Sequence, residues 1–160
     1  MTLSEYNSVI YDLEGGTPPK INERVIQATW NFLRELYDKK LVKANHDVNK
    51  GGFIITIAEM CFKNRLGANL DLKSYNINDL RDDILLFSES AGRFVIESEP
   101  RDHDKIMNIA KQQGIFIRKI GEIIQEPKIN VNGLKGNKFS LQTDKLKELY
   151  DSTLPNLMEL

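Results

Sequence analysis

Apolar positions recur at helical spacing between residue 22 and about residue 40. This stripe consists of Val25, Ile26, Thr29, Phe32, Leu33, Leu36 and Tyr37. Its width is typical of a helix that packs one side against a core. Asn22 is a candidate N-cap at its start, and lysines gather at its end, where the helix dipole favours cations. The pattern predicts a first helix here, after a lead-in segment of residues 1–19 that closes with a Gly-Gly-Thr-Pro-Pro turn.

Alternating and β-branched stretches predict six strands along the rest of the chain. They cover residues 42–48, 67–72, 93–98, 115–124, 128–131 and 138–141, with Gly121 a candidate bulge. Three further helices are predicted at 79–87 (N-cap Asn78), at 102–113 (ended by Gly114) and from Thr143, limited by Pro155. Phe53–Phe62 has strand composition in its first half and helix composition in its second, and its length favours a buried helix. The order of elements predicts an α+β fold, one mixed sheet with helices packed on it.

Composition and charge narrow the class of protein. The 160 residues are 41% hydrophobic and 28% charged, which is typical of a globular domain. The net charge is −1 with both signs interspersed, and the absence of a basic stripe argues against nucleic acid as a partner. No apolar run approaches the roughly 20 residues that span a bilayer, and the N-terminus lacks signal-peptide features. We therefore expect a soluble cytoplasmic domain with no membrane partner.

A first candidate site lies at His46-Asp47-Val48-Asn49-Lys50-Gly51-Gly52, between a predicted strand and a predicted helix. Gly51 and Gly52 let the backbone approach a ligand, and the helix N-terminus presents N–H groups to an anion. Asp47 or His46 has the chemistry to bind a ligand hydroxyl, and Lys50 adds positive charge. The alternative interpretation is an ordinary turn with an N-cap and a surface histidine.

A second candidate site is Ser88-Glu89-Ser90-Ala91-Gly92-Arg93, between a helix end and a strand start. Ser88 and Ser90 supply hydroxyls and Arg93 a guanidinium, a set that is suited to coordinating a phosphate. The alternative interpretation is a loop in which Arg93 pairs with Glu89 or is solvated.

Other chemically suggestive residues point to structure rather than to a site. Asp102-His103-Asp104 stands at a predicted helix start, where capping and dipole charge explain it. Two histidines and one cysteine do not give the spacing of zinc ligands, so no metal site is expected. Cys61 has apolar neighbours and is expected in the core, and a lone cysteine excludes an internal disulfide.

Taken together, a series of short stretches resembles the C-terminal domain of the aminoimidazole-ribonucleotide-synthetase superfamily over nearly the whole chain. The closest likeness is to its amidine-forming branch, the phosphoribosylformylglycinamidine synthases. The matching stretches are Ser4–Tyr6, Gly15–Pro19, Leu41–Val48, Gly51-Gly52, Ala58–Met60, Gly67-Ala68 and Leu86–Val95. One departure stands out: Asn49 and Lys50 occupy positions where the family usually has Ser and Asp.

The resemblance implies a three-layer α/β/α fold, partly ferredoxin-like, over residues 20–160 as a single domain, with Phe53–Phe62 helical. It also implies an ATP-dependent C–N ligase of purine biosynthesis, in which ammonia displaces phosphate from an activated formylglycinamide ribonucleotide. ATP and Mg²⁺ would bind mainly to an N-terminal synthetase domain, and a glutaminase would supply ammonia. This chain would form part of the ribonucleotide cleft through Asp47, Gly51, Gly52, Ser88, Ser90 and Arg93, with no catalytic residue of its own.

Two alternatives stay open at this point. The chain resembles other ATP-dependent members of the superfamily, namely aminoimidazole ribonucleotide synthetases, selenophosphate synthetases and thiamine-monophosphate kinases, although the stretch from Phe87 to Arg93 favours the amidine-forming branch. The second alternative is a non-catalytic module that binds a ligand or assembles with other chains, with a homodimer as one such assembly.

Overall fold

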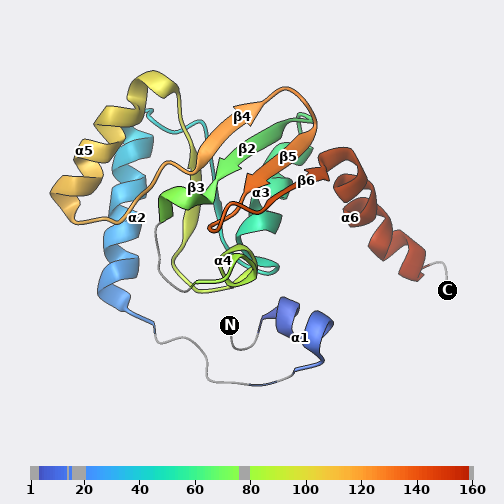
Figure 1. The fold of residues 1–160 in the computed structure, drawn as a ribbon. Helices are drawn as coiled ribbons and strands as arrows, with labels where there is room; N and C mark the ends of the chain where they lie inside the picture. Colours follow the sequence, from blue (N-terminus) through green and yellow to red (C-terminus); the bar gives the residue numbers. More distant parts are fainter. Residues whose placement is uncertain (1–3, 14, 16–20, 76–79, 159–160) are drawn as a thin grey trace. The chain divides into compact units, whose positions relative to one another are not determined.

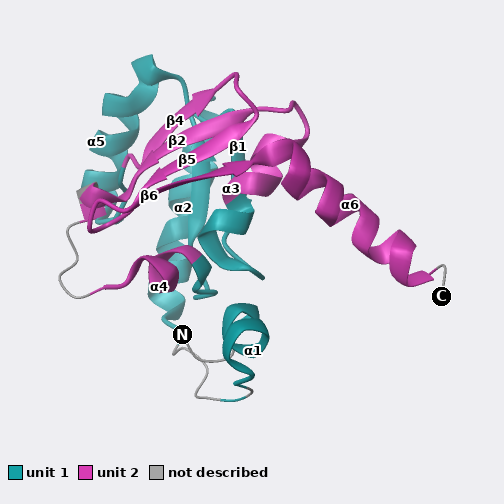
Figure 2. Ribbon diagram, turned by 45° about the vertical axis from the view of Figure 1, so that its right-hand side comes forward, with its two compact units in different colours: residues 1–56, 87–118 teal, residues 57–86, 119–160 magenta. Residues whose placement is uncertain are grey.

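The computed structural model describes residues 4–13, 15, 21–75 and 80–158. The chain divides into two compact units (Figure 2). Unit 1 contains residues 1–56 and 87–118, and unit 2 contains residues 57–86 and 119–160. Each unit is built from segments that are distant in sequence.

Unit 1 combines helices with a two-stranded ladder (Figure 1). Its elements are α1 (Glu5–Tyr11), α2 (Glu23–Asp38), β1 (Ala44–Asp47), the start of α3 (Gly52–Phe62), β3 (Phe94–Glu97), the 3₁₀ turn η2 (Pro100–Asp102) and α5 (His103–Gln113). Helix α2 follows the predicted boundaries, and the Asn22 side chain accepts a hydrogen bond from Val25 N at 3.2 Å, as an N-cap does. Helix α5 ends at Gly114, which has a left-handed φ of 65°.

The core of unit 1 lies between α2 and α5. It consists of Phe32, Leu36, Leu41, Ile106, Ile109 and Ala110, with Val42, Ile96, Ile115 and Ile117 packed against it. The predicted apolar stripe of α2 is buried at Phe32, Leu33 and Leu36, whereas its members Val25 and Tyr37 are about half exposed. Burial of these side chains is the main term that stabilises the unit.

Helix α1 lies inside the segment that the sequence pattern treats only as a lead-in. Ser4 is its N-cap, since Ser4 Oγ accepts from Asn7 N at 3.3 Å. The Tyr6 ring stacks on Phe87 with centroids 4.6 Å apart and planes at 11°. Seven residues give too weak a periodicity for a prediction, and these tertiary contacts supply the stability that such a short helix lacks alone. The turn at Gly16–Pro19 lies outside the described residues.

Unit 2 is built on a mixed four-stranded sheet in the order β4-β2-β5-β6. Its elements are the end of α3, β2 (Gly67–Asp71), the 3₁₀ turn η1 (Leu72–Tyr75), α4 (Asp82–Phe87, whose last residue belongs to unit 1), β4 (Gly121–Ile124), β5 (Lys128–Asn132), β6 (Lys138–Gln142) and α6 (Thr143–Met158). β2 pairs with β5 in parallel, and the other two pairings are antiparallel. Side chains alternate along β5, so that Ile129 and Val131 are buried while Asn130 bonds Asn69 at 2.9 Å.

Helix α6 is anchored to unit 2 at its first turn. Thr143 is buried and its hydroxyl donates to the Leu66 carbonyl at 3.1 Å. Arg65 makes two hydrogen bonds to the Asp144 carboxylate, at 3.2 and 2.7 Å. The hydrogen bond and the negative charge of Asp144 raise the pKa of Arg65. The rest of the helix exposes apolar side chains such as Leu149 and Leu154.

The predicted α+β class with a mixed sheet is confirmed, and so is the helical assignment of Phe53–Phe62, which becomes α3. Strands β1 and β3 are not members of that mixed sheet: they pair with each other along their whole length. Cys61 is 1% exposed in α3, in agreement with a core role. Among the described residues, no helix has the length and hydropathy needed to cross a membrane.

Two predicted boundaries and one predicted bulge need correction. Of the predicted strand 115–124, only Gly121–Ile124 is extended in the sheet, because Ile115 and Ile117 pack on the core of unit 1. Gly121 is not a bulge: it pairs in register with Leu70, and a Cβ there would lie 2.1 Å from the Asn69 carbonyl oxygen. The helix predicted at 79–87 begins at Asp82; its predicted N-cap, Asn78, lies outside the described residues.

Pro155 does not limit the last helix as predicted. Helix α6 continues through it to Met158. Proline has no backbone N–H and so removes one hydrogen bond of the helix. Pro155 lies in the final turn of α6, where few intrahelical hydrogen bonds remain to be broken.

The burial of Leu36 gives a test of the core of unit 1. Leu36 is fully buried, so Leu36→Ala is expected to lower the free energy of unfolding by about 2–5 kcal/mol. Val25→Ala, at a position of the same stripe that is 55% exposed, is the matched control and is expected to change it by less than about 0.5 kcal/mol. Urea denaturation followed by circular dichroism measures both, and equal losses would contradict the assigned core.

Candidate functional site

The β1–β3 ladder brings the two predicted site segments together within unit 1. Asp47 is the last residue of β1 and pairs with Phe94, the first residue of β3. One step further, Val48 N donates to the Arg93 carbonyl at 2.9 Å. In an antiparallel pair, the C-terminal end of one strand lies beside the N-terminal end of the other. Residues 47–52 and 88–93 therefore meet at one end of the ladder.

Glu89 joins these two segments, and sequence reasoning gave it no functional role. One carboxylate oxygen, Oε1, accepts from Gly51 N at 3.0 Å and from Glu5 N, the first residue of α1, also at 3.0 Å. Hydrogen bonds from N–H groups to an ionised carboxylate are stronger than those to a neutral acceptor. The sequence signal is an acidic residue between two serines, which by itself suggests only a partner for Arg93.

Two backbone N–H groups of the predicted anion site have acceptors within the protein. The sequence predicts that N–H groups at the start of α3 face an anionic ligand. In the structure Gly51 N is bonded to Glu89, and Gly52 N donates to the Asn49 carbonyl at 3.0 Å. A carboxylate of the protein already lies where the helix N-terminus attracts negative charge.

Gly51 and Gly52 both need the conformational freedom of glycine. Their φ angles are 79° and 74°, in the left-handed region. A Cβ on Gly51 would also lie 2.6 Å from Ile55 Cγ1. The backbone of this turn therefore passes close to the first turn of α3, with no room for a side chain.

The polar residues around the turn are linked by local contacts. Asn49 Nδ2 donates to Asp47 Oδ2 at 3.2 Å, and Thr56 Oγ1 donates to the Asp47 carbonyl at 3.3 Å. Lys50 Nζ lies 3.2 Å from Glu5 Oε1 on α1. The two residues that depart from the family pattern, Asn49 and Lys50, thus contact Asp47 and Glu5. The Asp47 side chain remains 57% exposed, so its carboxylate is still accessible to a ligand.

Arg93 closes the second segment on itself. Its Nη2 donates to the Ser88 carbonyl, and its Nε donates to the Ser90 carbonyl at 3.4 Å. Arg93 therefore links Ser88 and Ser90 within one short loop.

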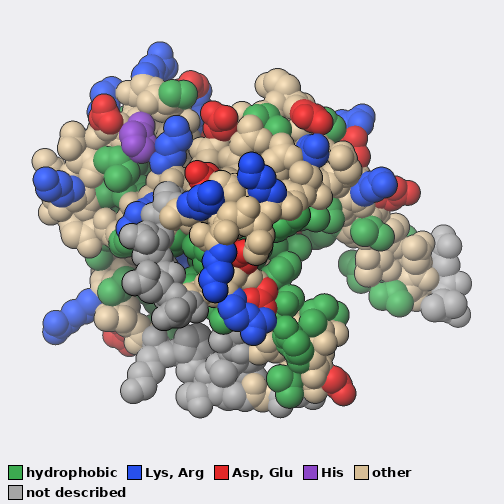
Figure 3. Space-filling view, viewed as in Figure 1, with side chains coloured by type: hydrophobic (Ala, Val, Ile, Leu, Met, Phe, Trp, Pro, Cys, Tyr) green, Lys and Arg blue, Asp and Glu red, His purple; other side chains and the backbone are tan. Residues whose placement is uncertain are grey.

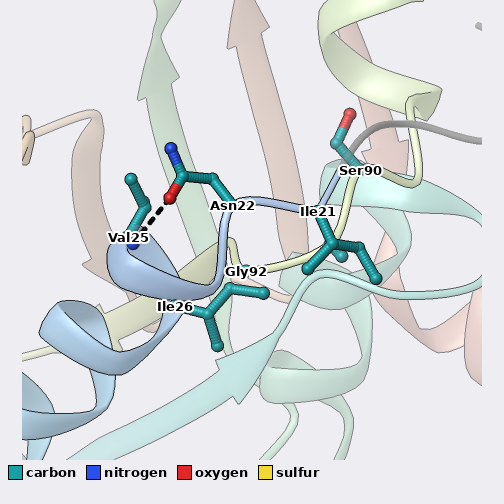
Figure 4. Close-up of a pocket in the computed structure, with 7 residues that line it drawn as sticks. Ile21, Asn22, Val25, Ile26, Ser90 and Gly92 are labelled. Carbon is teal, nitrogen blue, oxygen red and sulfur yellow. Dashed lines mark hydrogen bonds between the residues drawn. The ribbon is translucent and has the colours of Figure 1, made fainter.

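A small pocket of about 140 Å³ lies beside this loop (Figure 4). Ser90, Ala91 and Gly92 line one side, and the start of α2 lines the other through Ile21, Asn22, Val25 and Ile26. Gly92 has a φ of 80°, and a Cβ there would lie 3.2 Å from Ile26 Cγ1. The lining is mainly apolar, with Ser90 and Asn22 as its polar side chains.

The sequence predictions also concern metal-binding groups and surface charge. Within the described part of the chain, no three His, Cys, Asp or Glu side chains are grouped to hold a metal ion. Figure 3 shows basic, acidic and apolar side chains intermingled on one face.

The predicted cap of α5 does not form. Asp102 is at the N-cap position of α5 but makes no capping bond, because its backbone is αR. Its carboxylate accepts instead from Lys105 Nζ at 3.3 Å.

Comparison with known proteins defines the class. The sequence model of the family described as AIR synthase related protein, C-terminal domain, matches residues 4–134. The chain belongs to this family, as the sequence resemblance predicted.

Curated relatives narrow the likeness within the family. The chain is 32% identical over 155 residues to phosphoribosylformylglycinamidine synthase subunit PurL of Methanocaldococcus jannaschii, covering 97% of this chain and 20% of that protein. It is 30% identical over 156 residues to the same subunit of Moorella thermoacetica, again covering 97% and 20%. The chain thus spans about a fifth of the length of the curated relatives that it matches.

Solved structures show the same fold. Thermotoga maritima PurL complexed with FGAR gives a TM-score of 0.69 at 24% identity, covering 76% of this chain and 20% of that one. PurLQS from Thermotoga maritima gives 0.71 at 21% identity, covering 86% and 23%. HypE of Escherichia coli, a hydrogenase maturation protein, gives 0.56 at 21% identity, covering 69% and 38%. The α+β fold is therefore that of the PurL C-terminal domain.

The turn at Gly51 gives a prediction about the local backbone. Gly51→Ala is expected to lower the free energy of unfolding by at least about 1 kcal/mol more than Gly114→Ala, since only the former adds a side-chain clash to the left-handed strain. Gly114 is the matched control, because its φ is also positive but the space around it is open. Urea denaturation of both variants measures the difference, and equal losses would contradict the close approach to Ile55.

Proposed function

We propose that this chain forms part of the ribonucleotide-binding cleft of a formylglycinamide ribonucleotide amidotransferase, an ATP-dependent C–N ligase of purine biosynthesis. The observation that carries the proposal is the meeting of residues 47–52 with residues 88–93 at the end of the β1–β3 ladder. Family membership and identity of about 30% to PurL subunits support the choice of reaction. A related PurL has been solved with FGAR bound.

The proposal gives each segment a part of the ribonucleotide. Asp47 and the Gly51-Gly52 turn contact the ribose, the carboxylate by accepting from a hydroxyl and the glycines by permitting close approach. Ser88, Ser90 and Arg93 contact the phosphate. Because Gly51 N is bonded to Glu89, the contribution of Gly51 is its shape rather than its N–H.

The chain acts by positioning rather than by acid–base chemistry. In the proposed reaction, ATP activates the amide oxygen of the ribonucleotide and ammonia displaces phosphate to give the amidine. Holding the reacting groups in place supplies a large share of catalysis in reactions of this type. ATP and Mg²⁺ belong in the proposal to a partner N-terminal synthetase domain, and ammonia comes from a glutaminase. In this proposal, residues 20–160 form a single domain of the complete enzyme. The complete enzyme is placed in the cytoplasm.

The proposal is tested by titrating the ¹⁵N-labelled chain with formylglycinamide ribonucleotide and recording amide chemical shifts. We expect saturable shifts at millimolar ligand or below, concentrated in residues 47–52 and 88–93, and smaller shifts with a non-hydrolysable ATP analogue. Absence of shifts, or shifts confined to other parts of the chain, would contradict the proposed site. A stronger response to the ATP analogue would favour another ATP-dependent branch of the superfamily.

Arg93 offers a second test. Arg93→Ala is expected to raise the dissociation constant of the ribonucleotide about tenfold or more, because a charge-assisted bond to phosphate contributes about 1.5–3 kcal/mol. Arg93→Lys, the matched variant, keeps the charge but loses the fork that also bonds the loop carbonyls. Binding of the unphosphorylated riboside and of the ATP analogue should change much less. Equal losses for the ribonucleotide and these controls would contradict a phosphate contact.

A further inference from the structure

Three backbone segments of unit 1 converge on the carboxylate of Glu89. They are the start of α1 at Glu5, the Gly51 turn before α3, and the Ser88–Arg93 loop that carries Glu89 itself. Glu5 and Gly51 are 46 residues apart in the chain, and both N–H groups donate to the same oxygen, Oε1.

We propose that Glu89 is a positioning residue, which fixes the Gly51-Gly52 turn against the Ser88–Arg93 loop so that ribose and phosphate contacts are presented together. The choice of ligand rests on the proposed function, whereas the bond by which Glu89 holds the Gly51-Gly52 turn does not. The Gly51 amide is partly buried where it meets Glu89, and a buried N–H that loses its acceptor costs free energy. Glu89 is thus a required partner of the turn.

Position 50 adds a second connection between the turn and α1. Lys50 Nζ lies 3.2 Å from Glu5 Oε1, while the Glu5 backbone N–H donates to Glu89. Both Lys50 and Glu5 side chains are largely exposed, so this ion pair contributes little to stability. It does give Lys50, which replaces the usual acidic residue of the family, a local counter-charge. The hydrogen bonds of Glu89, rather than this pair, are expected to hold the turn.

The experiment compares Glu89→Ala, which removes the acceptor, with Glu89→Gln, which keeps an acceptor oxygen without the charge. Glu99→Ala is the matched control: Glu99 is also in unit 1, and its carboxylate pairs with Lys43 at 3.0 Å, outside residues 47–52 and 88–93. Amide hydrogen exchange of Gly51 and Glu5 is measured first, without ligand. Titration with formylglycinamide ribonucleotide follows, at a temperature where each variant is folded.

We expect Glu89→Ala to speed exchange at Gly51 and Glu5 about tenfold and to weaken ribonucleotide binding by about tenfold. Glu89→Gln should recover most of both effects, and Glu99→Ala should match the wild type. A purely structural role would lower the melting temperature and leave the affinity of the folded variant unchanged, which would overturn the proposal. Unchanged exchange at Gly51 in Glu89→Ala would overturn it as well.

The two proposals fail in different ways. If wild-type chain does not bind the ribonucleotide, the proposed function is contradicted, and amide exchange still decides whether Glu89 holds the turn. If the wild type binds and Glu89→Ala binds equally well, the proposed function stands and the role of Glu89 is contradicted.

Discussion

The antiparallel pairing of β1 with β3 is the constraint on which the candidate site depends. Each strand has only four residues, yet the register sets Asp47 opposite Phe94 and continues into the bond from Val48 N to the Arg93 carbonyl. Two loops that are some 40 residues apart in sequence therefore begin at the same place. A shift of register by one residue would turn every side chain of a strand to the opposite face and separate the two loops.

Glu89 adds to the ladder what backbone pairing alone does not provide. The ladder fixes where each loop starts, whereas the carboxylate fixes Gly51, which lies four residues past the end of β1. Gly51 and Gly52 both have left-handed backbone angles, and Ile55 leaves no space for a side chain at Gly51. Arg93 performs a similar task within its own loop by bonding two carbonyl groups. Glu89 and Arg93 therefore hold the two loops through bonds to backbone groups.

Much of this fold was predictable from local pattern. The stripe of α2, its Asn22 cap and the α+β order of elements depend on periodicity and capping, which operate over a few residues. The membership of β1 and β3 in a separate ladder was not predictable, because strand partners are chosen by tertiary packing. Gly121 shows the same limit: glycine indicated a special position, but the cause is the nearby Asn69 carbonyl oxygen, which only the sheet reveals.

The same distinction applies to the site. Two segments rich in glycine, hydroxyl and charged residues stood out in the sequence, and the structure brings them together. Glu89 was missed because an acidic residue in a loop has no local signature when its partners, Gly51 and Glu5, are 38 and 84 residues away. Its place also changes how the site is understood. The N–H of Gly51 donates to a carboxylate of the protein, so in our proposal the phosphate contacts are assigned to the guanidinium and hydroxyl groups of the neighbouring loop.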